Sequence, residues 1–290
     1  MLIHLNSQIV PRDCAVVSVF DRGFLFGDGV YEGLRTTRGR VIGLDRHVER
    51  MRAGLSEARI SGFDPAGLGD LTTELIRANG LSEAGVYWQV TRGTPPEGAP
   101  PRARLPHPGT RPTVMGFAVP MKAPEAYVSP EVRRLSLRPD TRWTRGHLKS
   151  IALLGGVLAA IEADELGADD AVMHKDGLVT EGTATNVFAV IGGKMVTPSL
   201  ESAPMLAGVT RALILAEDSS IEVRPVTVEE LRRADEVMLT GTYTMVSAGS
   251  TLDGAPIGKG GVPGDGARRL LSVLLRAIER DVHSPHALAR

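Results

Sequence analysis

The chain has 290 residues, of which 42% are hydrophobic and 23% are charged. This length suits two domains of about 100–200 residues each, and the composition excludes a disordered chain or a coiled coil. The longest apolar run, 151–161, has 11 residues, too few for a bilayer span of about 20. A net charge of −1 indicates no nucleic-acid partner, and a single cysteine, Cys14, excludes an intrachain disulfide. The first residues lack a signal-peptide pattern, so we expect a cytoplasmic protein with no membrane contact.

Strands and helices are both predicted in the first third of the chain. We expect a strand over 15–20, a hairpin of 29–35 and 40–44 around Arg38-Gly39, a helix over 45–59, a helix from Asp64-Pro65 to Gly80, and strands over 85–92 and 113–120. Between the last two strands, residues 94–112 contain seven prolines and no periodicity. Loops of this length are usually functional or disordered. If this one is extended, Arg102 and Arg104 point the same way.

The second half of the chain mixes the two kinds of element as well. We expect a strand over 132–138, a helix over 149–165, hairpins around Asp176-Gly177 and Gly192-Gly193, a helix after Gly208, a capping box at Thr227 and Glu230, a strand over 237–240 and a helix over 265–281. Because strands and helices do not alternate strictly, the sequence predicts an α+β fold. The predicted domains are 1–120 and 126–290, joined by a linker at 121–125.

Two charged residues stand where chemistry could occur. Lys149 lies at the predicted start of an apolar helix, where the helix dipole and apolar neighbours would lower the pKa of its amine and favour a neutral nucleophile. Glu181 ends a predicted strand beside small residues and could face a ligand. Taken alone, Lys149 can equally be a solvated surface lysine and Glu181 an ordinary exposed acid.

Other segments could bind an anion or line a pocket. Gly208-Val209-Thr210 precedes a helix and Thr240-Gly241-Thr242 follows a strand, and free N–H groups at a helix start bind phosphate. Arg50 lies on the first predicted helix, and Tyr31 follows glycines that let a strand approach a ligand closely. A plain helix start, a strand end, a solvated arginine and a packed tyrosine are the alternatives. The histidine spacing predicts no metal site, and we find neither a nucleotide loop nor a serine-hydrolase elbow.

Four motifs in order resemble one enzyme family over most of the chain. They are the segment from Asp21-Arg22-Gly23 to Val30-Tyr31-Glu32, Lys149-Ser150 with Leu153-Leu154-Gly155, Thr180-Glu181-Gly182 with Asn186-Val187-Phe188, and Gly208-Val209-Thr210-Arg211. They are similar to the class IV, fold type IV, pyridoxal-phosphate aminotransferases. Tyr87, the segment Gln89–Thr94 and Arg142-Trp143 make the D-amino acid aminotransferases the most similar group.

The resemblance implies a two-domain fold with the active site between the domains and with the cofactor lysine in the larger C-terminal domain. It further implies that Lys149 attaches pyridoxal 5′-phosphate and moves the substrate proton, and that Glu181 keeps the pyridine nitrogen protonated. The phosphate would be held by Arg50, Val209, Thr210 and Thr242. Leu206 would pack near the ring and Tyr31 would line the substrate side. The substrates would be an amino acid and a 2-oxo acid, and the enzyme a homodimer.

This chain departs from the D-amino acid pattern at two places. In the family, an arginine and a histidine of this loop bind the substrate carboxylate across the dimer. If the Pro-rich loop of this chain contains an insertion of about four residues, Arg102 and Arg104 align with that arginine and histidine. Thr242 is followed by Tyr243-Thr244-Met245 where the family has an acid and Thr-Pro-Val. Alternatives are a branched-chain L-amino acid aminotransferase, then an aminodeoxychorismate lyase, and, in another class, a cofactor-free binding protein.

Overall fold

The computed structural model of the chain describes residues 1–258 and 260–283. The chain packs as two compact units. Unit 1 comprises Met1–Pro124, Leu148–Ala152 and 281–283, and unit 2 comprises Glu125–His147 and Leu153–Arg280. Lys149 was expected in the C-terminal domain, but the short segment that carries it packs with the N-terminal unit.

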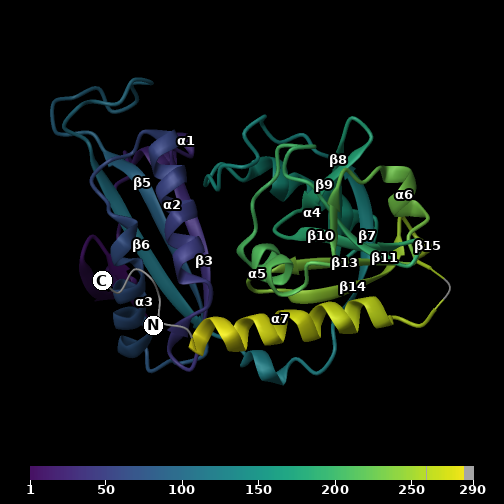
Figure 1. Ribbon diagram of the computed structural model, residues 1–290. Helices are drawn as coiled ribbons and strands as arrows, with labels where there is room; N and C mark the ends of the chain where they lie inside the picture. The colour runs from purple at the N-terminus through teal and green to yellow at the C-terminus, as the bar shows by residue number, and fades with distance from the viewer. Residues whose placement is uncertain (259, 284–290) are drawn as a thin grey trace. The chain divides into compact units, whose positions relative to one another are not determined.

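Unit 1 is built on an antiparallel sheet whose strand order is β2-β1-β6-β5-β3-β4 (Figure 1). Its elements are β1 (Leu2–Leu5), β2 (Gln8–Pro11), η1 (Arg12–Cys14), α1 (Arg22–Phe26), β3 (Gly29–Thr37), β4 (Arg40–Val41), α2 (Leu44–Ala58), η2 (Pro65–Gly67), α3 (Leu68–Ala78), β5 (Ala84–Thr94), β6 (Arg111–Pro120) and η3 (Pro124–Ala126), which reaches the unit boundary. Helices α2 and α3 cover one face of this sheet. The core between them includes Leu34, Val48, Leu75 and Trp88, all completely buried.

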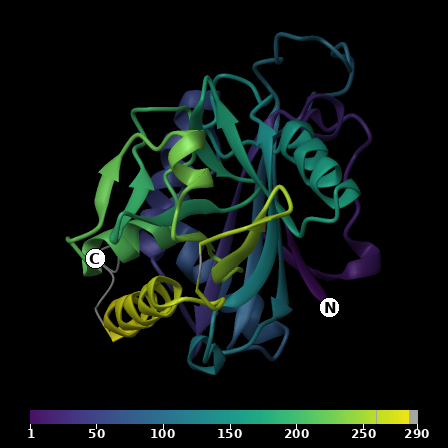
Figure 2. The same cartoon turned by 90° about the vertical axis from the view of Figure 1, so that its right-hand side faces the viewer.

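The Pro-rich segment of unit 1 forms a long loop between β5 and β6. It occupies residues 95–110 and extends beyond the strands that it connects, as both views show (Figures 1 and 2). The long loop that the sequence predicts is confirmed, and residues 101–102 form a turn within it, so the loop is not extended there. Prolines on both sides of Arg102 and Arg104 favour such irregular structure, because they cannot donate to a strand ladder.

Unit 2 contains a larger mixed sheet, of order β12-β11-β10-β13-β14-β7-β8-β9 with β15 paired to β14. Its elements are β7 (Glu131–Pro139), α4 (Leu154–Glu165), β8 (Asp170–Lys175), β9 (Leu178–Gly182), β10 (Asn186–Ile191), β11 (Lys194–Pro198), α5 (Val209–Glu217), β12 (Glu222–Arg224), α6 (Val228–Arg232), β13 (Glu236–Gly241), β14 (Met245–Leu252), β15 (Ala255–Pro256) and α7 (Asp265–His283). The core includes Leu135, Val172, Val187 and Leu239.

The turns that the sequence predicts are confirmed in both units. Arg38-Gly39, Asp176-Gly177 and Gly192-Gly193 connect antiparallel strands, and all three pairs have positive φ at both residues, as a two-residue hairpin requires. Thr227 and Glu230 form the expected capping box of α6. No helix of the described residues is both long and apolar enough to cross a bilayer.

Two predicted elements are wrong. Residues 15–20 form no strand, and Val16, Val19 and Phe20 remain exposed, because this stretch pairs with no strand of the sheet. The helix expected from Lys149 begins five residues later, at Leu154. Lys149 and Ser150 instead lie along the edge of β3, so the helix-dipole argument for the lysine fails.

Candidate active site

Backbone hydrogen bonds to β3 hold Lys149 in place. Its carbonyl accepts from the Tyr31 N–H at 3.0 Å, and the Ile151 N–H donates to the Gly29 carbonyl at 3.1 Å. The Lys149 amine, Nζ, lies 4.2 Å from the centroid of the Tyr31 ring. A short strand pairing therefore presents the half-buried side chain of Lys149 against an aromatic face.

An aromatic row continues from Tyr31 across the sheet of unit 1. The Tyr31 ring stacks on Tyr87 with centroids 5.5 Å apart, and Tyr87 stacks on Phe117 at 5.2 Å. The Tyr87 hydroxyl donates to Gln89 Oε1 at 2.8 Å. Burial, and secondarily the Tyr31 hydroxyl, raise the pKa of Tyr87 to about 12, so its hydroxyl stays protonated. The row offers a stacking surface next to the amine.

A buried acid on the opposite face of β3 holds Arg50. Successive side chains of a strand point to opposite faces, so Glu32 faces α2, where its carboxylate accepts from Arg50 Nε and Nη2 at 2.7 Å each. His47 Nδ1 lies 2.7 Å from the same carboxylate. Burial opposes ionisation of Glu32, but the Arg50 and His47 contacts outweigh it and lower the pKa of Glu32 from 4.5 to about 2. Burial also lowers the pKa of His47. Arg50 is thus fixed by a bidentate ion pair.

Glu181, in unit 2, is buried and held from both sides. Its Oε1 accepts from Arg142 Nη1 at 2.6 Å, and its Oε2 accepts from the Leu206 N–H at 3.2 Å and from Asn186 Nδ2 at 3.3 Å. Asn186 Nδ2 also donates to the Leu206 carbonyl at 3.0 Å. The same contacts therefore fix the carboxylate and the backbone of Leu206.

Arg142 is itself balanced by a second acid. Its Nε and Nη2 donate to Asp140 at 2.9 and 2.7 Å, and the Thr180 hydroxyl donates to Asp140 Oδ2 at 3.0 Å. Burial opposes the charge of Arg142, but Asp140 and Glu181 together raise its pKa above the usual range. An arginine of permanent charge keeps an adjacent carboxylate ionised.

The start of α5 forms an anion-binding geometry. Gly208 is the N-cap and makes no side-chain cap, while Val209 and Thr210 are buried in the first turn. A Cβ on Gly208 would lie 1.9 Å from Asn186 Oδ1, so a larger residue would displace the amide that holds Glu181. Among the described residues, the Thr240 hydroxyl is buried without a hydrogen-bond partner; it lies at the end of β13, two positions before Thr242.

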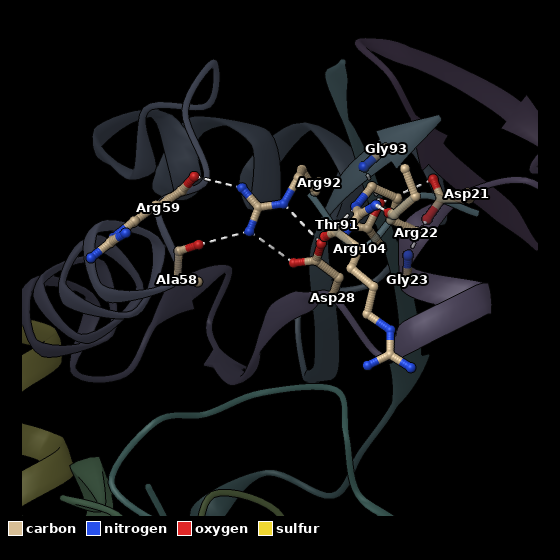
Figure 3. Close-up of polar contacts among 11 residues, drawn as sticks. Asp21, Arg22, Gly23, Asp28, Ala58, Arg59, Thr91, Arg92, Gly93 and Arg104 are labelled. Carbon is tan, nitrogen blue, oxygen red and sulfur yellow. Dashed lines mark hydrogen bonds and ion pairs between the residues drawn. The ribbon is translucent and has the colours of Figure 1, made fainter. Parts of the chain in front are cut away.

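The two loop arginines have different surroundings. The Arg102 guanidinium lies 5.3 Å from the centroid of the Phe26 ring. Arg104 is exposed, and Figure 3 shows its guanidinium directed away from the surrounding polar cluster. The expectation that both side chains point the same way is not met, because the loop turns at 101–102.

The structure thus places the Lys149 amine against Tyr31 in unit 1. Arg50 belongs to the same unit but lies on the other face of β3. Glu181, Leu206, Val209, Thr210 and Thr242 belong to unit 2. Sequence reasoning assigned no role to Glu32, His47, Asp140, Arg142 or Asn186. The positions of His47 and Arg50, three residues apart on one helix face, were the available signal for the Glu32 contacts. No local pattern indicated the contact between Arg142 and Glu181, because the two residues are 39 positions apart in the sequence.

These residues fit pyridoxal 5′-phosphate. A buried carboxylate in an ion pair with Arg142 suits a protonated ring nitrogen. An uncapped helix start with an unpartnered buried hydroxyl among the described residues suits a phosphate. A half-buried lysine amine suits covalent attachment of an aldehyde.

Comparison with known proteins agrees with this chemistry. The family model for amino-transferase class IV matches residues 29–250. D-alanine aminotransferases from Staphylococcus haemolyticus and Bacillus licheniformis are each 34% identical, over 90% and 96% of this chain and 92% and 97% of theirs. The structure of a branched-chain amino acid aminotransferase from T.th. with pyridoxamine 5′-phosphate superposes with a TM-score of 0.85, at 29% identity over 96% of this chain and 94% of that one. The chain therefore belongs to the class IV aminotransferases and is a pyridoxal-phosphate-dependent transaminase with the α+β architecture of fold type IV.

Proposed function

We propose that this transaminase exchanges the amino group of a D-amino acid with a 2-oxo acid such as 2-oxoglutarate or pyruvate. One observation carries the proposal: the identity to D-alanine aminotransferases is 34% over nearly the whole of both chains. The identity to the branched-chain aminotransferase is 29%. The exposed Arg104 on the Pro-rich loop supports the same assignment, since it offers a cation for a substrate carboxylate.

Lys149 and Glu181 carry the chemistry in this proposal. Bound pyridoxal phosphate supplies an electron sink for the charge left when the α-proton departs. The Lys149 amine would hold the cofactor and would carry the proton between the substrate Cα and the cofactor side. Glu181, which accepts from Arg142 at 2.6 Å, would accept a hydrogen bond from the protonated ring nitrogen.

The phosphate and the ring are held by residues of several elements. Backbone N–H groups at Val209 and Thr210 and the hydroxyl of Thr242 would hold the phosphate, and Leu206 would pack near the ring. Arg50, which Glu32 fixes, would supply a further cation for the phosphate. An arginine has five N–H donors, so one guanidinium can serve a carboxylate and a phosphate together.

On the substrate side, Tyr31 lines the space next to the Lys149 amine. Its stacked neighbour Tyr87 extends that wall for the substrate side chain. The Pro-rich loop carries two arginines, Arg102 and Arg104, as candidate cations for the α-carboxylate, a group that both substrates of a transaminase have.

We also propose a homodimer, because α4 exposes a wide apolar surface. Leu154, Val157, Leu158 and Ile161 are 70, 49, 46 and 48% exposed. Ala159 and Ala163, on the helix's other side, form the buried contact with β8. Contiguous apolar surface of this kind marks an interaction site, and a second copy of the chain has a matching face in a symmetric pair. A cytoplasmic location stays a prediction.

A half-reaction tests the substrate assignment. The enzyme loaded with pyridoxal phosphate is mixed separately with D-alanine, L-alanine, D-glutamate and L-leucine, and the visible absorbance of the bound cofactor is followed. We expect D-alanine and D-glutamate to convert the cofactor to its pyridoxamine form. Conversion by L-leucine alone would contradict the proposal and establish the branched-chain alternative.

A further inference from the structure

A buried arginine outside the residues assigned so far is bonded to the backbone of the Pro-rich loop. Arg22 Nη1 donates to the Ala103 carbonyl at 2.6 Å, and Nη2 donates to the Arg104 carbonyl at 3.0 Å. The side chain of Arg22 is only 7% exposed. Charged groups are rarely buried unless they are paired, so the buried guanidinium of Arg22 requires a partner of opposite charge.

Asp28 is the partner that holds Arg22 in this position. Its Oδ2 accepts from Arg22 Nε at 2.8 Å and from Arg92 Nε at 2.8 Å, and its Oδ1 accepts from Arg92 Nη2 at 2.9 Å. Burial opposes ionisation of Asp28, but hydrogen bonds and charge from Arg92 and Arg22 lower its pKa below the usual range. The carboxylate is therefore shared between two guanidinium groups (Figure 3).

Arg92 connects this cluster to the rigid part of unit 1. Its Nη1 donates to the Arg59 carbonyl at 2.6 Å and its Nη2 to the Ala58 carbonyl at 2.7 Å, at the C-terminus of α2. These carbonyls end a helix and need donors. The loop is thus bonded through Arg22, Asp28 and Arg92 to the end of a packed helix, as Figure 3 shows.

The cluster separates the two arginines of the loop. Arg22 and Arg102 both place their guanidinium groups near the Phe26 ring, at 4.8 and 5.3 Å from its centroid. Arg104 contributes its backbone carbonyl to Arg22, and its side chain leaves the cluster. Within the described part of the chain, neither the Arg102 nor the Arg104 guanidinium makes an ion pair or hydrogen bond. Arg102 lies against the Phe26 ring, whereas Arg104 makes no ring contact there, so the Arg104 charge is the one left available to a ligand.

We infer that Arg22 is a positioning residue for the substrate carboxylate: by bonding the Ala103 and Arg104 carbonyls, it sets the loop backbone so that Arg104, and not Arg102, presents its guanidinium to the substrate. This inference rests on the proposed function for its substrate. The anchoring itself does not depend on the reaction. A loop held at its arginine needs no ordering when the substrate binds, and this lowers the entropic cost of binding.

Arg22→Lys tests the anchor, because lysine keeps the charge near Asp28 but lacks the guanidinium fork. Trypsin cuts after exposed arginines, so cleavage after Arg102 and Arg104, located by mass spectrometry, reports loop opening in the folded enzyme. Proteolysis follows the population of the open state. Losing these charge-assisted bonds should speed cleavage by about tenfold or more. Unchanged cleavage rates would overturn the anchor.

Arg35→Lys is the matched control. Arg35 is also buried in unit 1, and its Nη2 donates to the Lys122 carbonyl, far along the chain from the loop. We expect this variant to lose stability without faster cleavage after Arg102 and Arg104. If Arg22→Lys does not fold, Asp28→Asn keeps Arg22 but removes the charge that holds it, and the same faster cleavage is expected.

Steady-state kinetics test the link to Arg104. Arg22→Lys should raise KM for both the amino acid and the 2-oxo acid by about three- to tenfold with little change in kcat, as lost uniform binding does. Arg104→Ala should raise KM by about tenfold or more. In the double variant the effect of Arg22→Lys on KM should disappear, because the residue acts through Arg104. Additive effects, or a larger effect from Arg102→Ala, would overturn the assignment.

The two readouts separate this inference from the proposed function. If no D-amino acid converts the cofactor but Arg22→Lys speeds cleavage, the substrate assignment fails and the anchor stands. If D-amino acids react and cleavage is unchanged, the anchor fails alone.

Discussion

Lys149 is the single residue on which the proposed chemistry depends most. Lys149→Ala should lower turnover by about 10²–10⁴ from lost acid–base work alone, and further from lost covalent attachment. Borohydride should then no longer fix pyridoxal phosphate to the protein, as measured by intact mass. Lys194→Ala is the control, since Lys194 is exposed and pairs with Glu222. Normal borohydride labelling of the Lys149 variant would show that another lysine holds the cofactor.

The pKa of Glu32 makes the free energy of unfolding depend on pH in the acid range. Its pKa is about 2 when folded, against an ordinary 4.5, so the unfolded chain binds the proton first as pH falls. Its stabilising contribution is therefore complete above pH 4.5 and is lost as pH falls toward about 2. The difference corresponds to about 3 kcal/mol.

Glu32→Gln should therefore lower the urea midpoint at about pH 7, and this deficit relative to wild type should shrink as pH falls below about 4.5. The affinity for pyridoxal phosphate, measured by equilibrium dialysis, should fall with it, because Arg50 loses the carboxylate that orients it. Glu49→Gln, on the exposed side of α2, should change neither quantity. A deficit that is the same at every pH would contradict the role of the ionised carboxylate.

At this scale the sequence identified residues but not their partners. Tyr31, Lys149 and Glu181 stand in motifs that can be read from a single chain. The pairing of Glu32 with Arg50 depends on which face of β3 meets α2. The pairing of Arg142 with Glu181 depends on the segment after β7 meeting β9, and the two residues are 39 positions apart in the sequence. Such contacts come from tertiary packing, which local patterns do not contain.

Among the elements, the start of α5 has the tightest steric constraint. Gly208→Ala would place a methyl group 1.9 Å from Asn186 Oδ1 and push away the amide that holds Glu181 and Leu206. Overpacking of this kind costs about 1–3 kcal/mol, and we expect the affinity for pyridoxal phosphate, measured by dialysis, to fall about tenfold. Gly67→Ala is the matched control, because a Cβ there meets no atom within 4 Å. Equal cofactor affinity in both variants would show that Asn186 can move without harm.

Elements whose ends carry strong local signals were predicted well. The hairpins at Arg38-Gly39 and Asp176-Gly177 need residues that accept positive φ, and the capping box fixes α6 by its own side chains. The helix at Lys149 was misplaced, because an apolar run is ambiguous between strand edge and helix until its partner is known. The strand predicted over 15–20 rested on β propensity alone. Because no neighbouring strand pairs with these residues, they form a loop.

For the whole molecule, the proposed homodimer depends on the apolar face of α4. Leu158→Glu should convert the proposed homodimer into a monomer at micromolar concentration, because a buried unpaired charge opposes association. Sedimentation velocity measures the change. Val128→Glu is the control, since Val128 is 95% exposed outside α4, and it should leave the dimer intact. A Leu158 variant that sediments as the wild type does would place the interface elsewhere.

The hydrogen bonds that Lys149 and Ile151 make with β3 also bear on aggregation. Without them, the Tyr31 N–H and the Gly29 carbonyl would stand open at a strand edge, and open edges recruit strands from other chains. The segment that carries Lys149 therefore also shields this edge from other molecules. A substitution that loosens residues 148–152 should harm catalysis and solubility together. Selection for a non-aggregating chain would then preserve the backbone around Lys149 even in a descendant that no longer catalyses any reaction.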